Sequence, residues 1–232
     1  AFCVQETRAA VLGSIMGLRS RWMSHPAAVW QAEFKPFQLS LAAGFGLEIP
    51  KTVVTNEPQV ILESYAEFGR MIVKATRSGH LTRAGEEFAM FTSEVLERHL
   101  EEVNRAKLSP AIYQALIPKR HDIRVTIVGQ QVFAVAIESQ SDPSAMIDWR
   151  QTQNSQLPHH RITLPADIAS KLLLLMDSMR LAFGAVDMIE TPDGEYVFLE
   201  INPNGQWLWL DDMLDCGISD AVATWLSKTD LI

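Results

Sequence analysis

The sequence has few cysteines, no long hydrophobic run and no cluster of basic residues, and each absence excludes a class of protein. The two cysteines, Cys3 and Cys216, match no metal-ligand spacing and cannot form a disulfide framework, which favours the cytoplasm as the location. No apolar stretch approaches the length of a membrane span, and the N-terminus lacks a signal-peptide pattern. With a net charge of -8 and no run of lysine and arginine, the chain is not expected to bind nucleic acid.

The composition is that of a globular protein. The 232 residues are 47% hydrophobic and 21% charged, enough for a core in one domain or in two closely apposed lobes. Apolar residues recur at helical spacing over about 6–22. Since the chain starts at Ala1 rather than at a methionine, we expect it to be processed or to be part of a longer protein.

A stretch near the C-terminus has oxygen-bearing side chains inside an apolar strand. Residues 196–201 predict a strand, and its alternation places Glu200 and Asn202 on one face. A second apolar run, 183–189, contains Asp187, and the Thr-Pro-Asp-Gly turn between the two runs predicts a hairpin.

The length of the hairpin loop decides whether the oxygen-bearing side chains lie on the same face of the sheet. If the loop has four residues, so that Glu190 faces Glu195, then Asp187, Glu200 and Asn202 share a face; a three-residue loop sends Asp187 to the other side. Two carboxylates and an amide carbonyl suit magnesium, which often shares its coordination sphere with substrate phosphates. The alternative is an ordinary solvated hairpin, and spacing alone does not choose between them.

Cationic residues occur within apolar segments elsewhere. Lys35 lies in a predicted helix over 26–45, and Lys74 lies in a predicted strand that a polar, glycine-containing loop over 76–85 follows. Arg124 lies in a predicted strand over 122–128, where it needs a carboxylate, a phosphate or solvent.

The order of these features resembles that of the ATP-grasp ligases, with Lys35 and Lys74 as strand-borne lysines. More closely, four phrases resemble the microviridin-type graspetide ligases, which cyclise ribosomally made peptides, and the likeness covers nearly the whole chain. The phrases are Phe34-Lys-Pro-Phe-Gln-Leu39, Ile117-Pro-Lys-x-x-Asp-Ile-Arg-Val-Thr-Ile-Val-Gly129, Asp148-Trp-Arg150 and Phe198-Leu-Glu-Ile-Asn-Pro-Asn-Gly-Gln-Trp207.

The resemblance implies an α+β fold in which two lobes close on ATP. Residues 26–232 would form the ATP-grasp domain, with the smaller lobe at about 48–115 and the remainder as the metal-binding lobe. Residues 1–25 would be the helix at the end of an N-terminal domain. Its apolar stripe of Ala9, Leu12, Ile15 and Met16 would then lie partly exposed or be buried in a homodimer.

The resemblance also implies roles for particular residues. Lys35 and Lys74 would reach the ATP phosphates, with Lys74 and Arg124 taking part in catalysis as Arg124 meets the transferring phosphoryl group. The remaining roles are adenine contact by Gln114, Ala115, Leu116, Ile117 and Leu199, magnesium binding by Asp187, Glu200 and Asn202, and substrate binding by Arg124, Arg150 and Asn204. Ala115 departs from the acid that many members have, and Lys119 and Arg120 stand near the expected ribose contact.

The expected activity is an ATP-dependent ligase that joins a carboxylate to an amine or an alcohol. Transfer of the γ-phosphoryl group would form an acyl phosphate, and attack on it would give amide or ester crosslinks in a ribosomal peptide. ATP, Mg2+ and a peptide or small-molecule carboxylate are the implied partners. The alternatives are a ligase for a small molecule or for glutamate addition to a protein, and a non-catalytic nucleotide-binding module.

Overall fold

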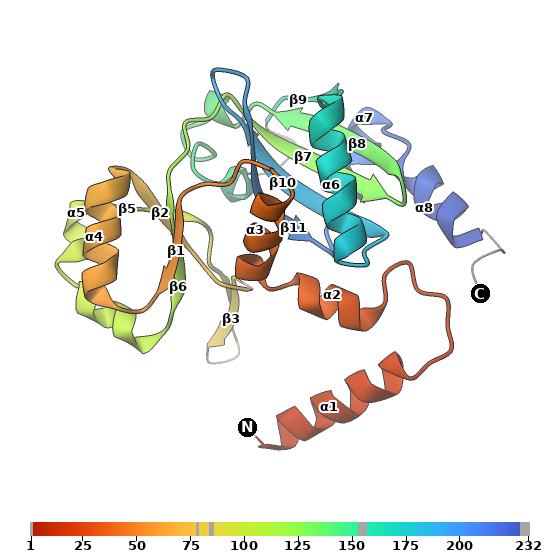
Figure 1. Ribbon diagram of the computed structural model, residues 1–232, viewed down its shortest axis with the longest axis horizontal. Coiled ribbons are helices and arrows are strands. Elements are labelled where there is room, and N and C mark those ends of the chain that lie inside the picture. The colour runs from red at the N-terminus through yellow and green to blue at the C-terminus, as the bar shows by residue number, and fades with distance from the viewer. Residues whose placement is uncertain (1, 78, 84–85, 153–156, 228–232) are drawn as a thin grey trace.

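Two antiparallel sheets divide the chain into a smaller and a larger lobe that lie side by side (Figure 1). The computed structural model describes residues 2–77, 79–83, 86–152 and 157–227. The predicted two-lobed α+β architecture is confirmed.

The smaller lobe packs helices on one face of a four-stranded sheet with the order β1-β6-β2-β5. Ile61 of its long helix α4 packs with Met71, Val95 and Tyr113 from the strands to form the core of this lobe. The elements are β1 (Thr52–Thr55), α4 (Pro58–Phe68), β2 (Met71–Lys74), β5 (Ser93–Val95), α5 (Glu97–Leu100), the 3-10 helix η1 (Val103–Leu108) and β6 (Ala111–Ala115).

The larger lobe contains a five-stranded sheet with the order β11-β10-β7-β8-β9. Its strands are β7 (His121–Val128), β8 (Gln131–Ile137), β9 (His159–Ile162), β10 (Phe183–Glu190) and β11 (Tyr196–Asn202). Two short 3-10 helices, η2 (Ser139–Ser141) and η3 (Trp149–Gln151), lie between β8 and β9.

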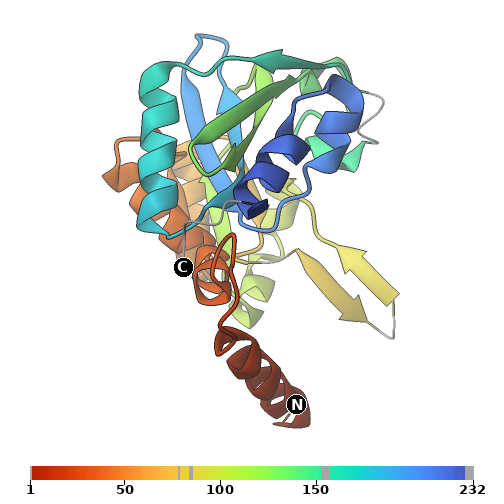
Figure 2. The same ribbon diagram turned by 90° about the vertical axis from the view of Figure 1, so that its right-hand side faces the viewer.

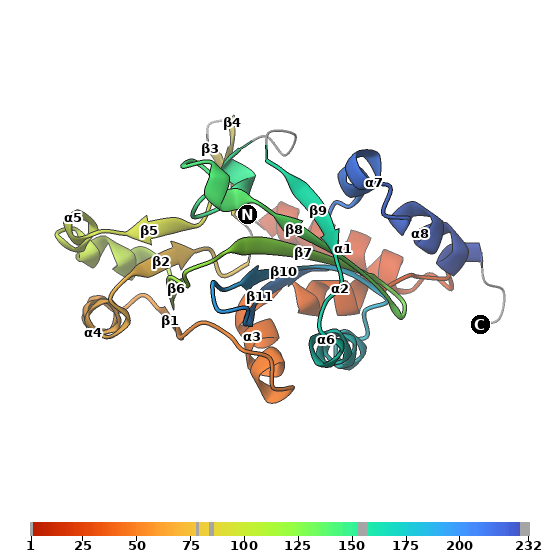
Figure 3. The same cartoon turned by 90° about the horizontal axis from the view of Figure 1, so that it is seen from above.

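Helices cover the two faces of this sheet unequally (Figure 3). One face packs against α2 (Pro26–Ala32), α3 (Lys35–Gly44) and α6 (Ala166–Ser178) and forms the main core. The other face is covered at one end by α7 (Leu208–Leu214) and α8 (Ile218–Ser227). The remainder of that face is therefore left for the cleft between the lobes.

The predicted single helix over 26–45 is wrong, because the chain forms two helices there, α2 and α3. Pro36 has no N–H to donate to the carbonyl of Ala32, as a continuous helix would require, and proline is favoured in the first turn of a new helix. The side chain of Gln38 donates to that carbonyl instead. The assignment of Lys35 to a strand is also wrong, since Lys35 is the first residue of α3.

Two segments project from the lobes (Figure 2). The predicted loop over 76–85 is wrong in part, because β3 (His80–Arg83) pairs with β4 (Glu86–Ala89) as a hairpin. Helix α1 (Phe2–Met16) extends away from the lobes and has no buried residue in its described length. Within the described residues, no helix combines the length and the hydrophobicity that crossing a membrane requires.

Candidate active site

Three neighbouring strands place Arg124, Asp187 and Glu200 in one row across the larger sheet. Asp187 of β10 lies opposite Arg124 of β7 on one side and opposite Glu200 of β11 on the other. Directly opposed residues point to the same face, and Nη1 of Arg124 lies 2.8 Å from Oδ1 of Asp187. The predicted common face for Asp187 and Glu200 is confirmed.

The register that produces this row differs from the prediction. Glu190 pairs with Tyr196 rather than with Glu195. The pairing then shifts by one residue, because Met188 faces Phe198 whereas its neighbour Asp187 faces Glu200. Leu199 is thus the extra residue of a β-bulge in β11. Because a bulge interrupts strict alternation, the side chains of Leu199 and Glu200 both line the cleft.

Glu200 is buried and surrounded by cations. Nζ of Lys35 lies 2.9 Å from its Oε2, and Nη1 of Arg150 lies 3.7 Å from its Oε1. Burial acts to raise the pKa of Glu200, but Lys35, Lys74 and Arg150 outweigh burial and hold that pKa at about 2. The side chain is therefore a carboxylate at any physiological pH.

Lys74 reaches the same region from β2 of the smaller sheet. It is buried, with 9% of its surface exposed. Burial lowers the pKa of Lys74 to about 8; Lys35 and Arg150 act in the same direction, whereas Glu200 and Asp187 oppose the shift. A nearby anion would therefore stabilise the charged form of this buried ammonium group.

The guanidinium group of Arg124 is held by hydrogen bonds through two of its nitrogens, and the third has no partner among the described residues. Its Nη2 donates to the carbonyl of Gln206 at 3.2 Å, whereas its buried Nε has no partner in the part of the chain that the structure describes. A Cβ on Gly205 would overlap with Ala185 and would lie 2.9 Å from Nη2 of Arg124. Glycine therefore allows the 203–206 loop to approach the arginine closely.

A narrow pocket between the lobes contains the residues assigned to adenine, Gln114 to Ile117 and Leu199, together with Lys74, Asp187 and Glu200. Nε2 of Gln114 donates to Thr52 at 2.8 Å, and its buried Oε1 has no partner among the described residues. The amides of Ala115 and Leu116 already donate to the carbonyls of Lys51 and Arg70. Among the described hydrogen bonds, none uses the amide of Ile117.

A wider pocket of about 770 Å³ adjoins it on the side of Asn204. Lys35, Arg124 and Glu200 lie along its inner wall, and Arg150 and Trp209 also line it. Arg150 is held by both oxygens of Asp148, at 2.8 Å each, and Asp148 also accepts from the amide of Thr92 in the smaller lobe. This pocket contains both residues that the sequence assigned to substrate binding alone, Arg150 and Asn204.

Solved structures with this fold include ligases of ribosomal peptides. A RiPP-associated ATP-grasp ligase of Chryseobacterium gregarium, solved with ADP and a leader and core peptide, is 31% identical with a TM-score of 0.88, over 97% of this chain and 68% of that one. The macrocyclase MdnC of Microcystis aeruginosa, bound with precursor peptide MdnA, is 35% identical with a TM-score of 0.83, over 95% and 69%. No protein-family model and no curated protein matches the chain.

The macrocyclase MdnB of Microcystis aeruginosa is 36% identical with a TM-score of 0.76, over 97% of this chain and 69% of that one. The chain belongs to the RiPP-associated ATP-grasp ligases. The predicted membership of the graspetide branch is confirmed, and ATP and Mg2+ are the cofactors of this ligase.

The hairpin of the ligase fits a magnesium site. Nδ2 of Asn202 lies 3.1 Å from Asp187 and 3.4 Å from Glu200, so one amide rotation would present three oxygens to one point. All donors are then hard oxygens, as magnesium prefers.

Some residues of the ligase site were missed in the sequence. Gln38 is buried and lines the wider pocket, and a polar side chain within an apolar helix face was its signal. Asp122 was also missed; it forms a buried ion pair of 2.7 Å with Lys119 in the narrow pocket. Asp122 is two residues from Arg124 on one strand, so alternation could have placed it on the same face.

Proposed function

We propose that this ligase uses ATP to activate a side-chain carboxylate of a precursor peptide and joins it to an amine or a hydroxyl of the same peptide. The observation that carries the proposal is the junction of the two pockets. Trp149, Arg150 and Glu200 line both a narrow pocket, suited to a nucleotide, and a wider one that could admit peptide side chains, and Lys35 and Arg124 line the wider pocket beside Glu200.

The reaction has two steps. An oxygen of the peptide carboxylate attacks the γ-phosphorus, the bond to the β-phosphate oxygen breaks, and ADP leaves as the acyl phosphate forms. The amine nitrogen or hydroxyl oxygen then attacks the acyl carbon, phosphate leaves with the bonding electron pair, and the nucleophile's proton passes to solvent. The net change in the peptide is the loss of one water for each bond formed.

Two lysines contact the ATP phosphates in this proposal. Lys74 comes from the smaller lobe and Lys35 from the larger one, so the phosphates lie between cations of both lobes. Glu200 holds Lys35 in place at 2.9 Å when no phosphate is bound. Lys74 has no ion pair within 4.0 Å among the described residues, so its ammonium group is available to pair with a phosphate oxygen.

Arg124 is proposed to contact the phosphoryl group during transfer. Asp187 and the carbonyl of Gln206 fix the position of its guanidinium group, and the unpaired Nε remains as a donor. Because the group is already oriented, it stabilises developing charge with little reorganisation.

Asp187, Glu200 and Asn202 would hold Mg2+, which when bound neutralises phosphate oxygens and helps to align ATP. Glu200 is ionised without it, since Lys35 pairs with this carboxylate. Lys35 would then be free to turn toward phosphate oxygens.

Arg150 and Asn204 are proposed to contact the peptide in the wider pocket. Arg150 is anchored by Asp148 while 41% of its side chain remains exposed, so it can bind a carboxylate without losing its position. On the nucleotide side, the free acceptor of Gln114 and the amide of Ile117 suit the donor and acceptor edges of adenine, with Leu199 against the ring. Lys119 is available to the ribose only if its pair with Asp122 adjusts.

Trapping with hydroxylamine tests the acyl-phosphate step. ATP, Mg2+ and precursor peptide should give ADP and a peptide hydroxamate in equal amounts when hydroxylamine is present. ADP release without any hydroxamate or crosslink would contradict the proposal. A homodimer, a cytoplasmic location and the assignment of residues 1–25 to a preceding domain stay predictions.

A further inference from the structure

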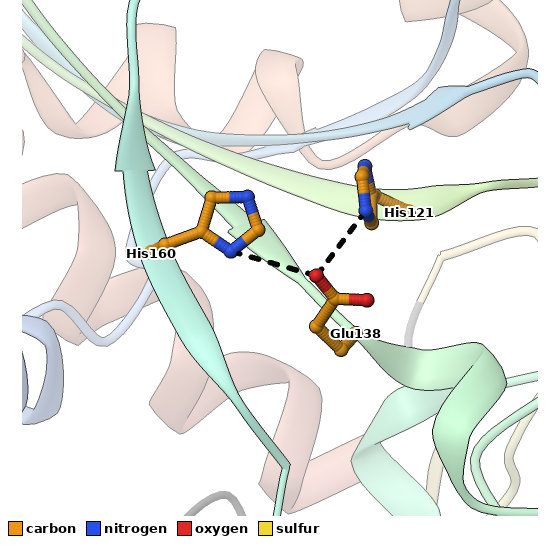
Figure 4. A group of neighbouring side chains, drawn as sticks. All are labelled: His121, Glu138 and His160. Carbon is orange, nitrogen blue, oxygen red and sulfur yellow. Dashed lines mark ion pairs between the residues drawn. The ribbon is translucent and has the colours of Figure 1, made fainter.

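A group of two histidines and a glutamate lies on the face of the larger sheet opposite the ATP site (Figure 4). His121 begins β7, Glu138 follows β8, and His160 lies in β9, so three adjacent strands contribute one residue each. On β7, His121 alternates with Asp122 and Arg124, whose side chains point to the ATP-site face. The group is therefore separate from the magnesium residues.

The side chains converge on one point. Nε2 of His121 lies 3.4 Å from Oε1 of Glu138, and Nδ1 of His160 lies 3.7 Å from the same oxygen. A tetrahedral ion with bonds of about 2.0–2.1 Å has ligand atoms about 3.3–3.4 Å apart. These two distances are close to that spacing, and the two histidine nitrogens lie within 4.8 Å of each other, so the side chains would move closer together on binding an ion.

Glu190 fixes the tautomer of His121. Nδ1 of His121 lies 2.7 Å from Oε2 of Glu190, and since an ionised carboxylate only accepts, Nδ1 carries the proton. Nε2 then points at Glu138 and is the nitrogen that would bind an ion. A carboxylate behind a histidine in this way is the usual support of a metal ligand.

A cation would fit between these atoms. Among the described ion pairs, Glu138 faces His121 and His160 and no lysine or arginine. One proton could bridge only one nitrogen to the carboxylate, whereas a metal ion could take all three lone pairs. Two imidazoles and one carboxylate select a zinc-type ion over magnesium or calcium.

We propose that His121, Glu138 and His160 bind a zinc-type divalent cation, with Glu190 supporting His121. The exposed fractions are 11% for His121, 38% for Glu138 and 47% for His160, so the ion can enter and water can fill the fourth position. The bound ion ties the ends of β7, β8 and β9 together, and Glu190 extends the link to β10. It stabilises the sheet and stands apart from the ligase reaction.

Calorimetric titration of the protein with Zn2+, in excess Mg2+ to occupy oxygen-only sites, tests the proposal. We expect one saturable equivalent of Zn2+. His160→Ala and Glu138→Gln should each weaken binding by at least tenfold, and Glu190→Gln should weaken it by about 10–100-fold. His99→Ala, which removes an exposed histidine of the smaller lobe, should leave the affinity unchanged.

His160 is exposed, so His160→Ala should fold normally, and thermal unfolding provides a second measurement. Zn2+ should raise the Tm of the wild-type protein and of His99→Ala but not that of His160→Ala, since an ion stabilises only a state that binds it. Unsaturable binding, or equal Zn2+ affinity in wild type and His160→Ala, would overturn the proposal.

Discussion

The side chain of Gln38 makes both backbone-like hydrogen bonds to Ile201. Its Nε2 donates to the carbonyl of Ile201 and its Oε1 accepts from the amide, each at 2.8 Å. Ile201 lies between Glu200 and Asn202 on an edge strand, and Gln38 is one turn after Lys35. This pair therefore sets the position of Lys35 against the carboxylate of Glu200.

Gln38→Leu should destabilise the protein and weaken ATP binding. The change leaves the buried amide and carbonyl of Ile201 unpaired, and we expect the free energy of unfolding to fall by about 1–3 kcal/mol. ATP affinity should fall as Lys35 loses its orientation. Chemical denaturation and calorimetry measure the two effects. Gln59→Leu on the exposed face of α4 is the control, and equal losses in both variants would contradict the role of Gln38.

Glu200→Gln should abolish ATP-dependent turnover. The amide keeps the shape of the side chain but removes the negative charge that pairs with Lys35 and that is proposed to bind Mg2+. Turnover is followed as ADP release in the presence of peptide. Glu67→Gln, which removes an exposed partner of Lys51, should retain wild-type activity. Wild-type magnesium-dependent turnover in Glu200→Gln would show that the metal site lies elsewhere.

Lys74→Met and Arg124→Ala should separate binding from chemistry. In the proposed mechanism Lys74 contacts ATP in its ground state, so its loss should weaken ATP binding. Arg124 is proposed to contact the phosphoryl group in transfer, so its loss should leave ATP affinity within a few fold while product is lost. Calorimetry and product analysis measure the two quantities. Equal loss of ATP affinity in both variants would contradict this division of roles.

ATP binding should take up a proton at alkaline pH. The pKa of Lys74 is about 8 in the folded protein against 10.5 ordinarily, so the free enzyme loses this cation as pH rises through 8. Bound phosphates favour the ammonium form and raise its pKa again. Above pH 8, ATP binding should therefore become weaker and bring proton uptake with it; well below pH 8 the uptake from Lys74 should vanish.

Calorimetry in buffers of different ionisation enthalpy measures this uptake. Lys74→Met should lose the pH-dependent part, whereas Lys51→Met, which changes an exposed lysine, should keep it. Uptake that persists unchanged in Lys74→Met would assign the proton to another group.

The sequence pointed to residues that the structure brings together in the cleft, but not to the strand register that aligns them. Alternation along β11 placed Glu200 and Asn202 on one face, because that relation is local to one strand. Whether Asp187 shares that face depended on the length of the turn. The loop has five residues rather than four, but the bulge at Leu199 places Asp187 opposite Glu200, so the two carboxylates still share the predicted face. A bulge has no reliable signal in one sequence, since its cause is tertiary packing.

Relations between distant segments were also beyond sequence analysis. Pro36 is a local signal of the break between α2 and α3, which the prediction of one helix overlooked, but nothing local shows that Gln38 would bond to Ile201, 163 residues away. The meeting of His121, Glu138 and His160 likewise depends on the strand order β7-β8-β9. His159 and His160 are adjacent in β9 and point to opposite faces, and His160 faces residues of other strands.

Mass spectrometry of a precursor peptide encoded beside the gene tests the proposed activity, when the peptide is incubated with the native gene product, ATP and Mg2+. The wild-type protein should remove one water from the peptide for each crosslink, only with ATP present, and fragmentation should place the new amide or ester between side chains. Glu200→Gln should leave the peptide mass unchanged. An unchanged peptide with the wild-type protein, under conditions where ATP and the peptide both bind, would contradict the proposed function.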